Sequence, residues 1–212
     1  MRSWRRVFSM VVIAIVAGLV WTATATAQKQ FQISPNGSSD GFGSALSISG
    51  DYAIVGADET SENGKDSGSA FIFKRSGENW TQTAKLIASD AQANAGFGYS
   101  VSISADYAIV GSLPIAKDGH VQSPAYIFAR TGTDWTEQSK LVASDAAELD
   151  FFGLKVSISG DYAVVGATGG DEGANGTGSS YLFRRSSDDS DNDVWSQSSK
   201  LLANDITQLT GF

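Results

Sequence analysis

The chain has 212 residues, a net charge of −8, no cysteine and a single histidine, His120. Without cysteine it can form no disulfide, thiolate nucleophile or cysteine-ligated zinc site. Its acidic balance disfavours nucleic acid and anionic lipid, so we expect neither a nucleic-acid partner nor a membrane partner for the mature protein.

The first 27 residues are typical of a secretory signal peptide. Arg2, Arg5 and Arg6 precede an apolar run over residues 7–21, and Ala25-Thr26-Ala27 supplies the small residues of a cleavage site. The run is shorter than the roughly 20 residues of a membrane span. We therefore expect cleavage after Ala27, a charge of −11 once the three arginines are removed, and a secreted, periplasmic or cell-surface location. An uncleaved anchor is the alternative. An exported chain without cysteine fits a bacterial origin.

The remaining residues contain a 55-residue repeat. Phe42, Phe97 and Phe152 open three copies at that spacing, and a fourth copy begins at Gly211-Phe212. Each copy contains an Asp-Tyr-Ala segment, which begins at Asp51, Asp106 or Asp161. A tryptophan follows, at position 80, 135 or 195, and then a Lys-Leu pair that begins at position 85, 140 or 200. A period of this length predicts a propeller or a solenoid.

The third copy is five residues longer than the others. The spacing from Tyr126 to Tyr181 is still 55, whereas that from Trp135 to Trp195 is 60. The extra residues therefore lie in the polar run over 186–193. We expect this run to be an exposed turn, because buried backbone does not absorb insertions.

Every copy shows four strand signals and no helical period. The first strand alternates apolar residues with serines, and a tight turn joins it to the second as a hairpin. The third strand is continuously apolar, which indicates that both of its faces are covered. The fourth begins at the tryptophan and is more polar. The pattern predicts an all-β propeller with three complete four-stranded blades and the start of a fourth, with blade repeats at about 41–95, 96–150 and 151–210.

The repeats resemble FG-GAP repeats, the units of the integrin α-chain propeller and of many bacterial surface proteins. The Phe-Gly openings and the Val-Gly-Ala segments at 55–57 and 165–167 carry the resemblance, which spans residues 41–212. It implies a fragment of a larger, roughly seven-bladed propeller. Calcium-binding members of the family have an Asp-x-Asp-x-Asp-Gly loop where this chain has only a Gly-Asp or Ala-Asp turn. One carboxylate cannot supply the six to eight oxygens that calcium prefers.

The acidic residues of the chain fall into two groups, those in the tight turns and those in the longer loops. We expect the turn residues Asp51, Asp106 and Asp161 to cap the amides of their own turns. The longer connections between second and third strands are ordinary solvated loops, loops that contact a partner, or a cation site. The candidate contact residues there are Asp58, Glu62, Asp66, Asp118, His120, Asp171 and Glu172.

The insertion is the most calcium-like stretch of the chain. Its candidate ligands are Asp188, Asp189, Asp191 and Asp193. It lacks the glycine and the distal glutamate of an EF-hand loop, so we expect no cofactor, with calcium as the one metal that it would suit. The recurring tryptophans are interpreted as packing residues at the rim of the blades.

The sequence contains no set of nucleophile, base and orienting group. We expect a non-catalytic, exported binding or adhesion scaffold that presents loops to a protein or glycan at the cell surface. The alternatives are an accessory propeller of a larger secreted enzyme and a truncated gene product.

Residues 30–34 match a fourth strand that has no blade of its own. In a closed propeller such a strand would pair with the last blade. Three blades are fewer than the four to eight that close a ring, so we expect an open series of blades. Its two end faces should expose apolar side chains and favour self-association.

Overall fold

The computed structural model describes residues 40–117, 120–146, 150–169, 178–187 and 193–202. The strand expected at 30–34 lies outside them. The described residues form three four-stranded antiparallel sheets and one two-stranded sheet, which confirms the all-β prediction. They contain no helix with the length and apolar character that crossing a membrane requires.

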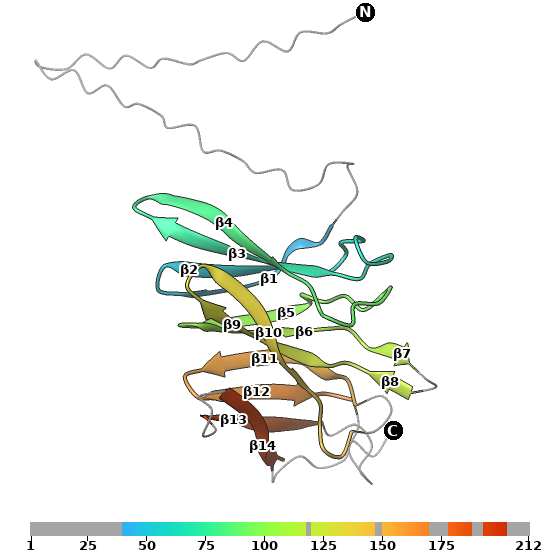
Figure 1. Ribbon diagram of the computed structural model, residues 1–212. Coiled ribbons are helices and arrows are strands. Elements are labelled where there is room, and N and C mark those ends of the chain that lie inside the picture. Colours follow the sequence, from blue (N-terminus) through green and yellow to red (C-terminus); the bar gives the residue numbers. More distant parts are fainter. Residues whose placement is uncertain (1–39, 118–119, 147–149, 170–177, 188–192, 203–212) are drawn as a thin grey trace, which may run out of the picture. The chain divides into compact units, whose positions relative to one another are not determined.

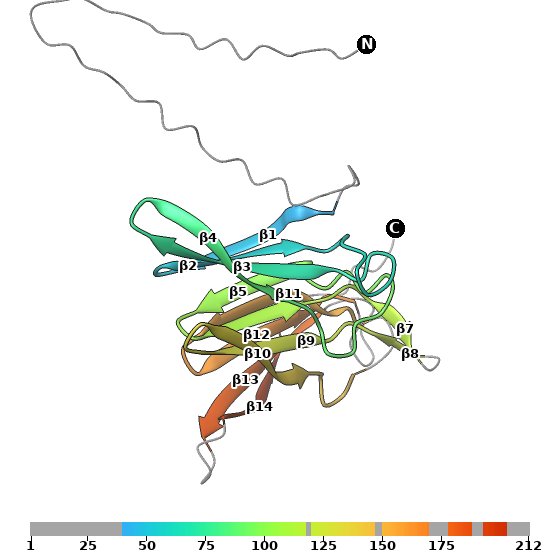
Figure 2. The same ribbon diagram turned by 45° about the horizontal axis from the view of Figure 1, so that its top comes forward.

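Each large sheet is one blade, and Figures 1 and 2 show the three blades stacked in chain order. Blade 1 contains β1 (Phe42–Ser49), β2 (Tyr52–Ala57), β3 (Ser69–Ser76) and β4 (Asn79–Leu86). Blade 2 contains β5 (Ser100–Ser104), β6 (Tyr107–Gly111), β9 (Ala125–Thr131) and β10 (Asp134–Leu141). Blade 3 contains β11 (Phe152–Ser159), β12 (Tyr162–Ala167), β13 (Ser179–Ser187) and β14 (Asp193–Leu201). The small sheet pairs β7 (Ile115–Lys117) with β8 (His120–Gln122).

The first two strands of every blade form the expected hairpin. Ser49 pairs with Tyr52 in blade 1, and the same register holds in the other two blades. The first turn residue has a positive φ in each case, 57° at Gly50, 50° at Ala105 and 54° at Gly160. Glycine adopts this conformation without steric cost, whereas alanine does not.

The insertion of the third copy lies between β13 and β14, but the turn expected over 186–193 was too wide, because Ser186 and Ser187 belong to β13 and Asp193 belongs to β14. Ser187 at the end of β13 pairs with Asp193 at the start of β14. The five additional residues are therefore accommodated between two strands that remain in register.

The hydrophobic core is divided into two parts, and each lies between neighbouring blades. One part joins Ile54, Ile72 and Leu86 of blade 1 to Phe97 and Ile103 of blade 2. The other joins the equivalent residues of blade 2, Ile109, Ile127 and Leu141, to Phe152 and Ile158 of blade 3. β3 and β9 are buried through their apolar segments, which confirms that both faces of these strands are covered.

The Phe-Gly and Val-Gly pairs of neighbouring blades meet backbone to backbone. A Cβ added to Gly56 would lie 2.0 Å from the carbonyl oxygen of Gly98, and one added to Gly111 would lie 2.0 Å from that of Gly153. Gly98 and Gly153 have φ values of 101° and 91°, which residues with a side chain rarely adopt. The glycines that mark the repeat therefore let the backbones of neighbouring blades approach closely, with no room for a side chain.

The outer face of blade 1 and that of blade 3 are exposed, as expected for an open series. Phe42 is 44% exposed, whereas the equivalent Phe97 is 1% exposed. Leu201 of blade 3 is 48% exposed, whereas the equivalent Leu141 is 3% exposed. The phenylalanine is buried where another blade precedes its own, and the leucine is buried where another blade follows.

Candidate binding face

The long connections of blades 1 and 2 lie at one end of their sheets. Figure 1 shows the β2–β3 loop and the β7–β8 hairpin at the end opposite to the β1–β2 and β3–β4 turns. We call the described residues 58–68 and 112–124, without 118 and 119, together with the connection over 87–99, the loop face. It holds the sequence-predicted contact residues that the structure describes.

The β2–β3 loop is built around three buried hydroxyl side chains, Thr60, Ser67 and Ser69. Thr60 Oγ1 donates to Ala57 O at 3.2 Å and lies 2.7 Å from Ser69 Oγ. The Gly68 amide donates to Thr60 O at 2.9 Å. Buried polar groups that are satisfied in this way hold a loop in one conformation.

The loop is also tied to the connection that leads into blade 2. The Asn94 amide donates to Lys65 O at 2.7 Å, and the Gly96 amide donates to Asp66 O at 3.0 Å. On the far side of this connection the Leu113 amide donates to Ala95 O at 2.8 Å. The connection therefore links the loop of blade 1 to that of blade 2.

The structure places the three acidic candidates of the first loop differently. Glu62 is exposed and forms an ion pair with Lys85 of β4. Asp66 has a φ of 51° and lies 3.7 Å from Lys65 Nζ. Asp58 is half-buried, with its carboxylate against the backbone of Gly41. The three do not converge on one point that could hold a metal.

His120 lies at the start of β8, where its backbone pairs with Lys117 of β7. Asp118, Asp171 and Glu172 lie outside the described residues, as do Asp188, Asp189 and Asp191. Of the expected contact surface, the structure thus describes the β2–β3 loop and the β7–β8 hairpin. Over the described ranges, no group of three His, Asp or Glu side chains is arranged to bind a metal ion.

Asp193, the described residue of the acidic insertion, is engaged by its neighbours. Its carboxylate lies 3.1 Å from both Arg185 Nη1 and Ser187 Oγ, and it accepts a hydrogen bond from the hydroxyl of Tyr107. The Tyr107 hydroxyl and the Arg185 guanidinium hold the pKa of this carboxyl below its ordinary value. The carboxylate thus joins blade 3 to blade 2.

The turn aspartates do not act as simple turn caps, which corrects the sequence-based expectation. Asp51 Oδ1 accepts hydrogen bonds from Arg75 Nε and Nη2 of β3 at 2.9 and 2.6 Å. The same pair recurs as Asp106 with Arg130 and as Asp161 with Arg185.

The arginine of this pair reaches the preceding blade. Arg130 lies 4.7 Å from the ring centre of Tyr52, and Trp135 approaches the same ring edge-on at 6.2 Å. The arrangement recurs in the next blade with Tyr107, Arg185 at 4.4 Å and Trp195 at 5.9 Å. We call this contact the tyrosine clamp. It confirms that Trp135 and Trp195 are packing residues.

A second ionic contact also crosses each blade boundary. Asp145, in the connection after blade 2, accepts a hydrogen bond of 2.8 Å from Lys200 of blade 3. Lys200 lies over the Tyr181 ring at 5.4 Å. The hydrogen bond from Lys200 holds the pKa of the Asp145 carboxyl below its ordinary value, although partial burial opposes this. Asp90, Lys140 and Tyr126 form the same contact between blades 1 and 2.

The sequence contains a periodic signal for the tyrosine clamp. Arg75, Arg130 and Arg185 recur at the 55-residue period, each 24 residues after a turn aspartate. Their regular spacing could have indicated a shared partner. What it could not indicate is that the partner ring belongs to the preceding blade.

A model of the FG-GAP repeat matches residues 34–73, 80–128 and 135–183. A comparison with curated proteins found no match. The second and third matched segments begin in the fourth strand of one blade and end in the third strand of the next, so each spans a blade boundary and includes one glycine of the contact there. Because the matches cover more than half of the chain and run through all three blades, the chain belongs to the FG-GAP repeat family.

Proposed function

We propose that this chain is a non-catalytic, exported binding scaffold whose loop face contacts a protein or a glycan at the cell surface. The observation that carries the proposal is the contrast between the two ends of the blades. The hairpin turns at 50–51, 105–106 and 160–161 keep one length. The connections at the opposite end differ in sequence, and one of them contains β7 and β8.

The first loop combines a fixed backbone with exposed polar side chains. Thr60 and Ser67 are buried and hydrogen-bonded, whereas Glu59, Glu62 and Asn63 are exposed. A loop that is already ordered loses little conformational entropy when it binds. Exposed carboxylates accept hydrogen bonds from sugar hydroxyls and from basic protein side chains.

Export is the part of the proposal that rests on the sequence alone. The arginines, the apolar run and the Ala-Thr-Ala segment of residues 1–27 support it. N-terminal sequencing of the protein recovered outside the cytoplasm should begin at Gln28. Recovery of the intact N-terminus in the cytoplasmic fraction would contradict export.

Binding is tested by screening the purified chain against arrays of glycans and of extracellular proteins. A variant with Glu59→Lys and Asn63→Lys changes only exposed side chains of the loop face, and we expect it to lose the ligands that the parent chain retains.

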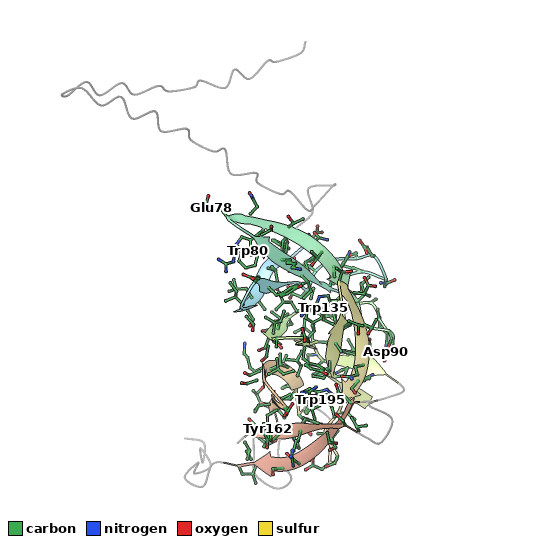
Figure 3. The ribbon with its side chains drawn as sticks, turned by 60° about the vertical axis from the view of Figure 1, so that its left-hand side comes forward. Glu78, Trp80, Asp90, Trp135, Tyr162 and Trp195 are labelled. Carbon is green, nitrogen blue, oxygen red and sulfur yellow. The ribbon has the colours of Figure 1, made fainter. Side chains whose placement is uncertain are left out.

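The matched control is Glu78→Lys, a charge reversal in the exposed β3–β4 turn at the other end of blade 1 (Figure 3). It should retain those ligands. A ligand lost in the control but not in the loop variant would place binding elsewhere, and turnover of any arrayed substrate would contradict the non-catalytic assignment.

A further inference from the structure

We propose that the two exposed end faces bind each other between two copies of this chain, so that blade 3 of one copy packs on blade 1 of the other. The head face consists of Phe42, Leu46, Ile48, Arg75 and Trp80 of blade 1. The tail face consists of Ser157, Ser159, Tyr162, Gly166 and Leu201 of blade 3. The two boundaries inside the chain show how such faces fit, because the same positions meet there twice.

The apolar side chains of the head face are those that a preceding blade covers elsewhere. Leu46 is 74% exposed, whereas the equivalent Val101 is 8% exposed beneath blade 1. Ile48 is 65% exposed, whereas Ile103 and Ile158 are buried. Exposed apolar clusters of this kind mark interaction surfaces.

Each end face has one of the two glycines that form the glycine contact inside the chain, Gly43 on the head face and Gly166 on the tail face. Gly43 keeps a φ of 97°, as Gly98 and Gly153 do, yet a Cβ there would meet no atom within 4 Å. A Cβ on Gly166 would meet nothing closer than 3.5 Å, whereas one on Gly111 would overlap a carbonyl oxygen. A second copy would bring Gly43 O onto Gly166.

The tyrosine clamp is divided in the same way. Tyr162 occupies the position of Tyr52 and Tyr107 but is 47% exposed. Trp80 and Arg75 are exposed on blade 1. Figure 3 shows Trp80 on blade 1 and Tyr162 on blade 3, with Trp135 and Trp195 between them. Across the proposed interface, Tyr162 would pack between Arg75 and Trp80 of the second copy.

Serine hydroxyls set the register of this interface. The amide of Ile103 donates to Ser47 Oγ at 3.2 Å, and that of Ile158 donates to Ser102 Oγ at 3.1 Å. The amides of Ala105 and Gly160 donate to Ser49 and Ser104 in the same way. The equivalent acceptors on the tail face are Ser157 Oγ for the Ile48 amide and Ser159 Oγ for the Gly50 amide.

The contact is heterologous, because different surfaces of the two copies meet. Heterologous contacts close into a ring when the rotation permits and otherwise continue as a filament. The described residues form three blades, so two copies of them bring six blades together, which is within the four to eight that form closed propellers. We therefore expect a dimer in which both head-to-tail contacts are made.

The test uses the purified chain and two variants that each alter one face. Leu46→Asp places a charge on the head face, at a side chain that is already exposed. Gly166→Ala adds one methyl group to the tail face, where the isolated chain has room for it. Each variant alone should dissociate in sedimentation velocity at concentrations where the parent is a dimer, with affinity about a hundredfold weaker.

The decisive measurement is the mixture of the two variants. The Leu46→Asp chain retains its tail face, and the Gly166→Ala chain retains its head face, so the mixture should form a one-to-one complex through one contact. A second tail-face variant, Tyr162→Asp, should give the same result as Gly166→Ala: it should not dimerise alone but should bind the Leu46→Asp chain. The matched control is Val142→Asp, which changes an exposed apolar residue just after β10, outside both faces, and should leave the dimer intact.

Three results would overturn the proposal. One is a monomeric parent chain throughout the concentration series. Another is a single variant that still dimerises, because a head-to-head or tail-to-tail contact needs only one of the faces. The third is a mixture that stays monomeric while circular dichroism shows both variants folded.

Discussion

At the scale of single residues, the repeat supplies internal comparisons, because a position that departs from its equivalents can be judged against them. Trp195 Nε1 donates to Gln138 Oε1 at 3.1 Å. In blade 2, Trp135 Nε1 is buried without a hydrogen-bond partner. The residue equivalent to Gln138 is Thr83, whose hydroxyl faces Ile72 O at 3.5 Å, and its side chain is too short to reach the indole.

Thr83→Gln should therefore stabilise the protein by about 1 kcal/mol, because it supplies the missing acceptor to a buried donor. Both positions lie at the register shift of their strand pair, so the longer side chain begins from the same backbone geometry. Urea denaturation measures the effect. The reverse exchange, Gln138→Thr, should destabilise by about 1–3 kcal/mol, and equal stability of the two variants would contradict this account.

Ala105 is a second residue that departs from its equivalents. Its φ of 50° is adopted by glycine in the other two hairpins. Ala105→Gly should stabilise the fold by about 0.5–1 kcal/mol, because the relief of steric strain exceeds the entropy that glycine loses.

The matched variant is Gly160→Ala, where a Cβ would meet no atom within 4 Å. Only the backbone conformation changes the free energy there, so we expect destabilisation of similar size. Thermal melts of both variants compare the two directly. A stabilising Gly160→Ala substitution would show that the turn carries no strain.

At the scale of elements, the strands of a blade are joined by ordinary ladders, whereas the blades are joined by a few recurring contacts. These are the glycine contact, the serine hydroxyls, the tyrosine clamp and the Lys–Asp pair. In blade 1 the lysine of the Lys–Asp pair has a different partner, because Lys85 forms an ion pair with Glu62 of the β2–β3 loop in the same blade. The residue 55 positions before Asp90 is Pro35, which has no carboxylate to offer.

Gly111→Ala should destabilise the protein by about 3 kcal/mol, because the methyl group would overlap the Gly153 carbonyl and force blades 2 and 3 apart. Gly166→Ala makes the same chemical change in the equivalent strand without that neighbour. Its unfolding free energy should remain within about 0.5 kcal/mol of the parent under monomeric conditions. Comparable losses in both variants would show that strand propensity, not the blade contact, requires the glycine.

At the scale of the whole molecule, ionic links across the blade boundaries make the packing of blades dependent on pH. The pKa of Asp145 and that of Asp193 are both held below the ordinary value in the folded state. A carboxyl of this kind adds stability above its unfolded pKa of about 3.9. That contribution is lost as the pH falls through the folded pKa.

Asp145→Asn should accordingly reduce stability at pH 7 by less than about 1 kcal/mol, since the pair is partly exposed. The difference from the parent should shrink as the pH falls from the unfolded pKa of about 3.9 through the lower folded pKa, because the carboxylate becomes protonated first in the unfolded and then in the folded protein. Urea midpoints between neutral and acid pH test this. A constant difference at all pH values would assign the effect to shape instead of charge.

The sequence predicted most of the fold because the signals involved are local or periodic. Alternation along the strand that begins at Phe42, the tight turn at Gly50 and the continuous apolar segment at Ala70 each depend on residues close in the chain. The 55-residue period then repeats the assignment in every blade. The location of the insertion between Tyr181 and Trp195 followed from the same count.

The site was predicted less well, because its contacts join residues far apart in the chain. The sequence alone determined the all-β repeat, the hairpins and the two end faces that no described blade covers. Only the tertiary structure decided that Asp106 binds Arg130 instead of its own turn, and that this arginine packs on Tyr52. The physical reason is that a side chain bonds whichever group the packing brings within reach, and packing between blades depends on residues one full repeat away.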